Sequence, residues 1–139
     1  MEKRPSTGVS VILIDKDNIL LGLRKGSHGG GTWGMPGGHI EWGESFHDCA
    51  IREIKEELGV LISCSPKPFH VTNDYFKKED KQYITVFIVA QIKKGMIENR
   101  EPNKCLEWKW FNYAKLPKKL FLPVENLVKQ KELRELFIQ

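Results

Sequence analysis

The chain has 139 residues, of which 40% are hydrophobic and 29% are charged, a composition typical of one globular domain and unlike a disordered or fibrous protein. We therefore expect a single domain over residues 1–139. The longest nearly apolar run, residues 84–92, is far shorter than the roughly 20 residues of a membrane helix, so no membrane span is expected. Residues 1–8 contain no apolar stretch of signal-peptide length, which predicts a cytoplasmic protein.

The formal net charge is +4, but the charges are unevenly distributed. Residues 41–57 contain six acidic and two basic side chains, so the rest of the chain carries +8. An acidic cluster in a basic protein indicates a cation site that faces an anionic ligand, although a solvated helix face has the same composition. The three cysteines form no CxxC or Cys/His cluster, which argues against zinc and against a disulfide framework.

The N-terminal third reads as a hairpin followed by a glycine-rich loop. Apolar runs and turn residues predict a strand, a polar turn, a returning strand, a glycine-rich loop and a short extended segment, at 9–14, 15–18, 19–23, 26–31 and 32–35. Pro36-Gly37-Gly38 then ends the extended segment.

A helix is predicted from Ser45, its N-cap, to Gly59, its C-terminal glycine, with Asp48 completing an approximate capping box. Its apolar residues recur every four positions and predict a stripe facing the core: Phe46, Ala50, Ile54 and Leu58.

The C-terminal half carries two strand patterns and one helix pattern. Residues 83–92 are β-rich and apolar on both faces, which predicts a central strand, and residues 106–111 alternate like a half-exposed strand. Pro123 is typical of a first helical turn, and residues 124–137 are predicted to continue that helix. This order indicates an α+β or mixed α/β architecture with helices packed on a sheet.

Three acidic residues of the predicted helix, Glu53, Glu56 and Glu57, stand at i, i+3 and i+4, so their side chains converge on one side. Like charges at this spacing repel, and a divalent cation removes that cost. Mg²⁺ prefers oxygen ligands, and this face has no His or Cys for zinc.

The neighbouring glycines and arginine extend this pattern. Gly37 and Gly38 leave the backbone bare, so that a carbonyl can reach a metal ion or an amide can reach a phosphate. Arg52 is placed to brace an upstream carboxylate such as Glu44, or to contact phosphate directly.

These residues match a known pattern at every fixed position. Gly38, five residues, Glu44, seven residues and then the run from Arg52 to Val60 form a Nudix box of 23 residues. The chain therefore resembles the Nudix hydrolase family, and residues 20–27, 36–45 and 101–110 resemble its MutT-like, nucleotide-sanitising branch. The resemblance implies an α/β/α sandwich around a mixed sheet, with the Nudix loop-helix and a C-terminal helix.

The resemblance also implies an activity: Mg²⁺-dependent hydrolysis of a modified or deoxy purine nucleoside triphosphate to the monophosphate and pyrophosphate, with Mn²⁺ as an alternative ion. By position, Glu53, Glu56, Glu57 and the Gly38 carbonyl are the implied metal ligands. Glu56 or Glu53 is the first candidate for the general base, and Arg52 with Glu44 forms the supporting salt bridge. Glu98 and Glu101 are reserve candidates for the base, for which ordinary loop solvation is the favoured interpretation.

The same resemblance places several residues at the substrate, each of which also has an interpretation as packing. The implied substrate-binding residues are Met35, Gly37, His39, Thr85, Phe121 and Leu122. Leu122 stands where close relatives carry a tryptophan, so its replacement by tryptophan is expected to tighten purine binding.

Three alternatives remain at this point. Two concern the substrate, which would be another nucleoside diphosphate derivative or an isoprenoid diphosphate. The third is that the chain is a nucleotide-binding regulatory module. Such modules lose box glutamates, and this chain has them all. Stable nucleic-acid binding is not expected, because no recognised module accompanies the basic pI of about 8.9. The resemblance permits a homodimer.

Overall fold

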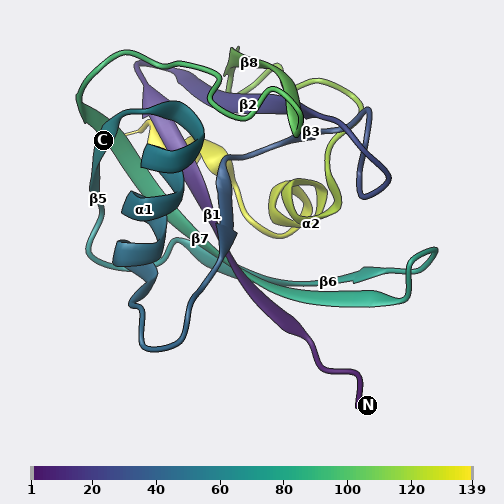
Figure 1. Cartoon of the computed structure of the whole chain (residues 1–139). Coiled ribbons are helices and arrows are strands. Elements are labelled where there is room, and N and C mark those ends of the chain that lie inside the picture. Colours follow the sequence, from purple (N-terminus) through teal and green to yellow (C-terminus); the bar gives the residue numbers. More distant parts are fainter. Residues whose placement is uncertain (1, 139) are drawn as a thin grey trace.

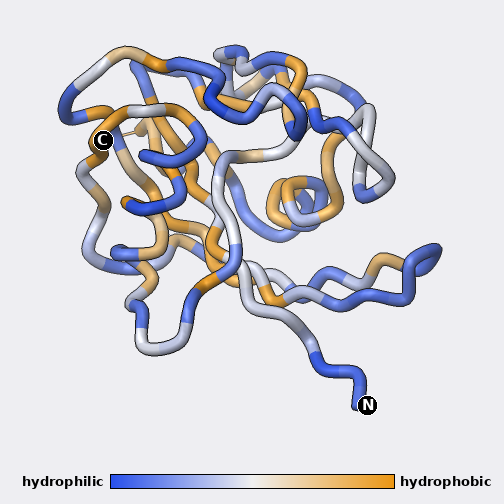
Figure 2. The backbone as a smooth tube through the Cα atoms, in the orientation of Figure 1, coloured by the Kyte–Doolittle hydropathy of each residue, from blue (hydrophilic) through white to orange (hydrophobic). Residues whose placement is uncertain are grey.

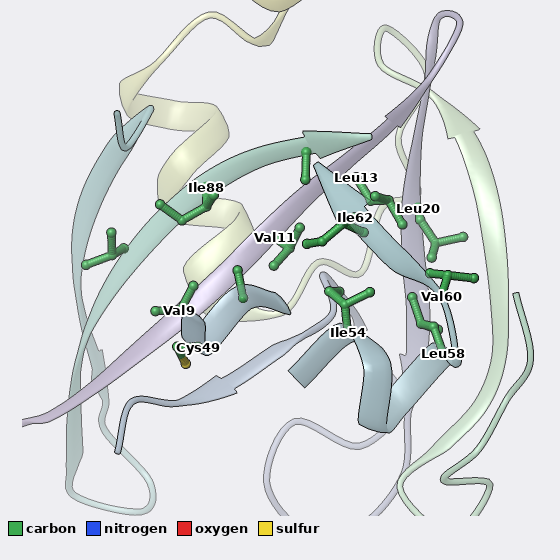
Figure 3. Close-up of a cluster of buried hydrophobic side chains, with 13 residues drawn as sticks. Val9, Val11, Leu13, Leu20, Cys49, Ile54, Leu58, Val60, Ile62 and Ile88 are labelled. Carbon is green, nitrogen blue, oxygen red and sulfur yellow. The ribbon is translucent and has the colours of Figure 1, made fainter. Parts of the chain in front are cut away.

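Strand β1 (Ser6–Asp15) supplies side chains to two separate apolar cores in the computed structural model, which describes residues 2–138. Because successive side chains of a strand face opposite sides, Val9, Val11 and Leu13 pack toward helix α1 (Phe46–Leu58), whereas Ile12 packs toward helix α2 (Leu122–Gln130). Figure 3 shows the first of these cores. One helix covers each side of the strand, as the expected α/β/α sandwich requires (Figure 1).

The remaining elements extend the sheet around β1. They are β2 (Asn18–Arg24), β3 (Trp33–Gly34), β4 (Gly37–His39), β5 (Leu61–Cys64), β6 (His70–Phe76), β7 (Lys81–Lys94), β8 (Cys105–Asn112) and a 3₁₀ turn, η1 (Leu133–Leu136). None of the helices within residues 2–138 is long and apolar enough to cross a membrane.

The sheet is mixed, as expected. Strand β7 runs parallel to β1, in a register that pairs Ser6 with Tyr83 and Leu13 with Ala90. Strand β4 pairs antiparallel with the other edge of β1, where Val9 faces Gly38. Strand β7 also pairs with β6 and β5, so it is the central strand that the sequence predicts. The tip of the β6–β7 hairpin is hydrophilic, whereas the strands between the helices are mostly apolar (Figure 2).

Helix α1 begins and ends where the sequence predicts. The backbone amide of Asp48 donates to the Ser45 hydroxyl at 3.1 Å, and Gly59 adopts a left-handed conformation with φ of 73° that only glycine accepts readily. The predicted apolar stripe is buried except at its first residue. Phe46 lies in the first turn with 38% of its surface exposed, so its expected place in the core is wrong.

The predicted C-terminal helix is shorter than expected. Helix α2 ends at Gln130, and Lys131 takes an extended conformation before η1 begins at Leu133. Leu133 is still buried against the same core as α2, so the apolar pattern continues across a break in the helix. A periodic apolar pattern reports which residues face inward and does not exclude a change of helix direction.

Strands β5 and β6 were not predicted. In β6 the residues that point inward, Thr72 and Asp74, are polar, whereas Val71 and Tyr75 are about half exposed. This inverts the usual alternation of a half-buried strand, so the hydrophobic pattern gave no signal for it.

Candidate active site

A cavity of about 620 Å³ lies between β1, β4, β7, helix α1 and the start of α2. Its walls include acidic, glycine, basic and aromatic residues, drawn from segments far apart in the chain: Gly37, Gly38, His39, Glu53, Glu57, Arg24, Lys25, Phe76, Tyr83, Thr85, Glu101, Lys104 and Phe121.

One wall of the cavity, the acidic wall, contains the carboxyl groups of Glu53 and Glu57, and Arg52 holds it in place. Its guanidinium forms two hydrogen bonds with the Glu44 carboxylate, Nε to Oε2 at 2.7 Å and Nη2 to Oε1 at 2.9 Å. The same group donates to the His39 carbonyl at 3.0 Å and to Glu53 Oε1 at 2.8 Å. The hydrogen bonds from Arg52 to Glu44 lower the pKa of Glu44 to about 2, so this carboxyl stays ionised. The predicted Arg52–Glu44 pair is therefore present, and it ties the β4–α1 loop to the helix.

Glu53 lies directly against Gly38. A Cβ atom added to residue 38 would lie 2.3 Å from Glu53 Cδ, so any larger residue there would displace the Glu53 carboxylate. Burial raises the pKa of Glu53, while the hydrogen bond from Arg52 opposes that shift. The glycine backbone of β4 and the largely desolvated carboxylate of Glu53 thus lie in contact in the cavity wall.

Glu57 lies deeper than Glu53. Its Oε1 accepts a hydrogen bond from the backbone amide of Gly37 at 2.9 Å. Burial raises its pKa to about 8, an effect that the neighbouring charges of Glu53 and Glu101 increase. Among residues 2–138 no lysine, arginine or histidine forms an ion pair with Glu57. A desolvated carboxyl of this kind, on a side chain that is only partly exposed, favours either a proton or a metal cation.

Glu56 is the outlier of the three predicted ligands. Its side chain is 55% exposed and lies 3.6 Å from the Arg52 Nη1 atom, and it is absent from the cavity lining. Within residues 2–138 no three Asp, Glu, His or Cys side chains already form a closed ligand set. The donors offered by Glu53, Glu57 and the Gly38 carbonyl are nevertheless oxygens, and both carboxyl groups are desolvated, which fits a hard divalent cation better than zinc.

The two reserve carboxylates occupy different places. Glu98 forms an ion pair with Arg100 at 3.2 Å, in a loop where the Glu98 amide donates to the Leu58 carbonyl at the end of α1. Glu101 lines the cavity, with Lys104 Nζ at 3.5 Å from its carboxylate. The structure therefore brings only Glu101 to the acidic wall.

An aromatic wall stands in the same cavity. The rings of Phe76, Tyr83 and Phe121 pack together, with centroids of neighbouring rings 5.5 Å apart. The Arg24 guanidinium lies 3.8 Å from the centre of the Phe121 ring, and burial lowers the pKa of Arg24. The His28 ring joins this group, and its Nδ1 lies 2.7 Å from Glu79.

Sequence reasoning missed Arg24, His28, Phe76 and Tyr83. Phe76 was hidden because β6 itself was not predicted. Arg24 and His28 carry no local signal, since each reaches the cavity only through the pairing of β2 and the fold of the glycine-rich loop.

Five of the six predicted substrate residues line the cavity, and one does not. Met35, Gly37, His39, Thr85 and Phe121 lie on its walls. Leu122 is half-buried at the start of α2 and is absent from the lining, although its neighbours Phe121 and Pro123 are part of it. Residue 122 therefore lies outside the lining of this cavity, and its expected role at the base stays a prediction.

Comparison with known proteins adds a family to this geometry. A family model of the NUDIX domain matches residues 4–131. The oxidized purine nucleoside triphosphate hydrolase of Mus musculus is 25% identical over 107 residues, which cover 77% of this chain and 66% of that protein. The ADP-ribose pyrophosphatase of Methanocaldococcus jannaschii is 31% identical over 113 residues, covering 78% of this chain and 63% of that protein. The chain thus spans slightly less than two thirds of these relatives.

A solved structure shares the fold over nearly its whole length. The MutT NUDIX hydrolase of Burkholderia pseudomallei superposes with a TM-score of 0.81 at 26% identity, covering 90% of this chain and 99% of that one. The mixed sheet with its two helices is therefore the α/β fold of the MutT NUDIX hydrolases.

Proposed function

The chain belongs to the NUDIX domain family, and on that premise we propose that it is a pyrophosphohydrolase of purine nucleoside triphosphates, in modified or deoxy form. It cleaves a phosphoric anhydride bond with water and releases the nucleoside monophosphate and pyrophosphate. The similarity to the oxidized purine nucleoside triphosphate hydrolase supports this substrate class.

The observation that carries the proposal is the pairing of two walls in one cavity. Glu53 and Glu57 stand beside the bare backbone of β4, and Phe76 and Phe121 offer apolar ring faces. A nucleotide has the matching parts: an anionic polyphosphate that needs charge neutralisation, and a flat base that stacks on aromatic rings. Lys25 and Lys104 add positive charge at the same cavity.

Glu53, Glu57, the Gly38 carbonyl and, after a change of rotamer, Glu56 would hold Mg²⁺. When bound, the ion neutralises phosphate charge and makes a water molecule more acidic. Two features support this assignment: the desolvated Glu57 carboxyl forms no ion pair among the described residues, and the Glu53 carboxyl touches Gly38.

The chain's own groups supply the remaining steps. Arg52 holds the β4–α1 loop and Glu53 in register through its bonds to Glu44 and the His39 carbonyl. Glu56 or Glu53 accepts the proton of the attacking water, and Glu101 is the alternative base because it shares the acidic wall. Water attack then needs no covalent intermediate on the protein.

The test is hydrolysis of a triphosphate panel with product analysis. We expect wild-type protein with Mg²⁺ to convert dGTP, 8-oxo-dGTP and dATP to the monophosphate and pyrophosphate, and Glu57→Gln to lose at least about a hundredfold in kcat. Release of orthophosphate in place of pyrophosphate would contradict the proposed bond, and equal rates for wild type and the variant would contradict the role of Glu57.

ADP-ribose is the second candidate substrate, favoured by the 31% identity to the Methanocaldococcus jannaschii pyrophosphatase. Its adenine would stack on the same aromatic wall, and its diphosphate would bind Mg²⁺ at the same acidic wall. Including it and an isoprenoid diphosphate in the panel separates the classes. Tight binding of a triphosphate without any hydrolysis would instead indicate a regulatory module.

A further inference from the structure

The buried polar side chains of residues 2–138 gather at one place. Thr72, Asp74 and Thr85 are the polar or charged residues in the described chain with less than a tenth of their surface exposed, and Asp74 is fully buried. Thr72 and Asp74 belong to β6, and Thr85 to the adjacent strand β7, where Thr72 and Thr85 are direct partners in the register.

Asp74 is the centre of this group. Its Oδ2 accepts hydrogen bonds from the hydroxyls of Thr85 at 2.6 Å and Thr72 at 3.0 Å. Its Oδ1 accepts from the Asn126 side-chain amide of α2 at 2.8 Å. Among the ion pairs formed by residues 2–138, none includes Asp74. All the partners of this buried carboxylate are thus neutral donors.

Such an arrangement is costly for the fold. Taking a carboxylate out of water carries a large desolvation cost. Three neutral hydrogen bonds offset this cost in part. A buried carboxylate without a cation beside a ligand cavity is therefore better explained by what it does to its neighbours than by stability.

Its effect on Thr85 is specific. A hydroxyl has one proton and two lone pairs, and the Thr85 proton is committed to Asp74. Thr85 lines the cavity, so any hydrogen bond it makes with a ligand must be one in which its oxygen accepts. The charge of Asp74 strengthens that acceptor, because a donor bound to a carboxylate is polarised.

We propose that Asp74 is a specificity-determining positioning residue, which locks the Thr85 hydroxyl as an acceptor so that the cavity selects nucleobases presenting an N–H donor to it. This inference rests on the proposed nucleotide substrate. Bases that present a carbonyl or an unprotonated ring nitrogen at the same point meet lone pairs and are rejected.

Thr72 provides a matched control. It donates to the same oxygen of Asp74 as Thr85 does, but it is absent from the cavity lining. Thr72→Val therefore removes one hydrogen bond from the network without changing what the cavity presents. Thr85→Val removes the acceptor itself, and Thr85→Ser restores it.

Asp74→Asn tests the polarity directly. If its oxygen still accepts from Asn126, the new amide points its N–H groups toward the two threonines. The Thr85 oxygen then accepts from residue 74, and its proton turns to the ligand. The side chain keeps its size, so the change is one of hydrogen-bond direction.

The experiment measures kcat and KM with Mg²⁺ for substrate pairs that differ at one purine edge: dGTP and dITP, 8-oxo-dGTP and dGTP, dATP and 2′-deoxynebularine triphosphate, and dITP and 2′-deoxynebularine triphosphate. The ratio of kcat/KM within a pair is independent of the fraction of folded enzyme. Wild type, Thr72→Val and Thr85→Ser are expected to favour the donor-bearing member of at least one pair by about tenfold, the equivalent of one hydrogen bond. Asp74→Asn and Thr85→Val are expected to lose that preference through KM.

Three results would overturn the inference. One is a wild type without preference in every pair. Another is the same preference in wild type, Asp74→Asn and Thr85→Val, which leaves the proposed function intact. The third is loss of preference in Thr72→Val together with Asp74→Asn, which would show a merely structural network. Absence of hydrolysis of every triphosphate by wild type would overturn the proposed function, and this inference with it.

Discussion

Arg52 and Glu44 lie eight residues apart and form two parallel hydrogen bonds, of 2.7 and 2.9 Å, between guanidinium and carboxylate. A planar fork of this kind fixes both distance and orientation, which a single ion pair does not. Because Arg52 also reaches the His39 carbonyl and Glu53, the clamp couples the wall of β4 to the acidic face of α1.

Replacement of this clamp is expected to lower activity more than it changes the fold. Lysine at position 52 keeps the charge but cannot bond to Glu44 with two nitrogens at once. Small displacements of catalytic groups cost large factors in rate, so we expect Arg52→Lys to lower kcat by roughly tenfold to a hundredfold. Steady-state kinetics with parallel thermal unfolding measures this. A normal kcat in Arg52→Lys would show that the clamp does not position the site.

The raised pKa of Glu57 predicts how the metal-free protein responds to pH. The pKa of Glu57 in the folded protein is about 8, against 4.5 for an unperturbed glutamate. The folded state thus binds this proton more tightly than the unfolded state does, and the free energy of unfolding is expected to fall as pH rises from about 4.5 to about 8. Glutamine at position 57 cannot ionise and still accepts from the Gly37 amide.

The measurement is the melting temperature of wild type and Glu57→Gln in EDTA between pH 5 and 9. We expect the two proteins to diverge with rising pH, with the variant more stable above pH 8. The difference between them isolates residue 57, since other groups titrate in both. Parallel curves over this range would contradict the raised pKa.

Binding of Mg²⁺ is expected to stabilise the fold. A ligand that binds only the native state, at a concentration a hundred times its Kd, raises the free energy of unfolding by about 2.7 kcal/mol. In a domain of this size each kcal/mol raises the melting temperature by roughly 4 °C. We expect this shift in wild type, and a much smaller one in Glu53→Gln.

Glu125→Gln is the matched control for this experiment. Glu125 pairs with Lys129 on the exposed side of α2, outside the cavity, so its Mg²⁺ shift is expected to equal that of wild type. An equal shift in Glu53→Gln would remove Glu53 from the proposed ligands.

The aromatic wall predicts a difference between two neighbouring residues. Phe121 contacts the cavity, Phe76 and the Arg24 guanidinium, whereas Leu122 does not line the cavity. We expect Phe121→Ala to raise KM for a purine triphosphate by tenfold or more, since it removes a ring face and a cation–π contact. Leu122→Ala is expected to change KM by less than threefold. The reverse order would restore Leu122 to the base pocket.

Local features of the acidic helix were readable from the sequence because they depend on neighbours a few positions apart. Ser45 and Gly59 mark its ends through backbone geometry that these residue types favour, and both were placed correctly. The spacing of Glu53 and Glu57 also follows from helical periodicity alone. Phe46 was misplaced because periodicity identifies a side of a helix and does not say how far the core extends along it.

The order of elements indicated helices packed on a sheet, and the Nudix box, a pattern of contiguous residues, implied the α/β/α sandwich. Strand β1 followed from its run of apolar residues. Only the tertiary structure decided how the aromatic wall is assembled and which hydrogen-bond network lies behind Thr85. Asn126 and Asp74 lie 52 residues apart, and they meet because α2 packs on β6, an edge that no local pattern revealed. The inward face of β6 is polar, so the hydrophobic signal that identifies strands is absent there. Hydrogen-bond direction at Thr85 depends on that contact, and therefore on packing between distant segments, whereas the glutamates depend only on the turn of one helix.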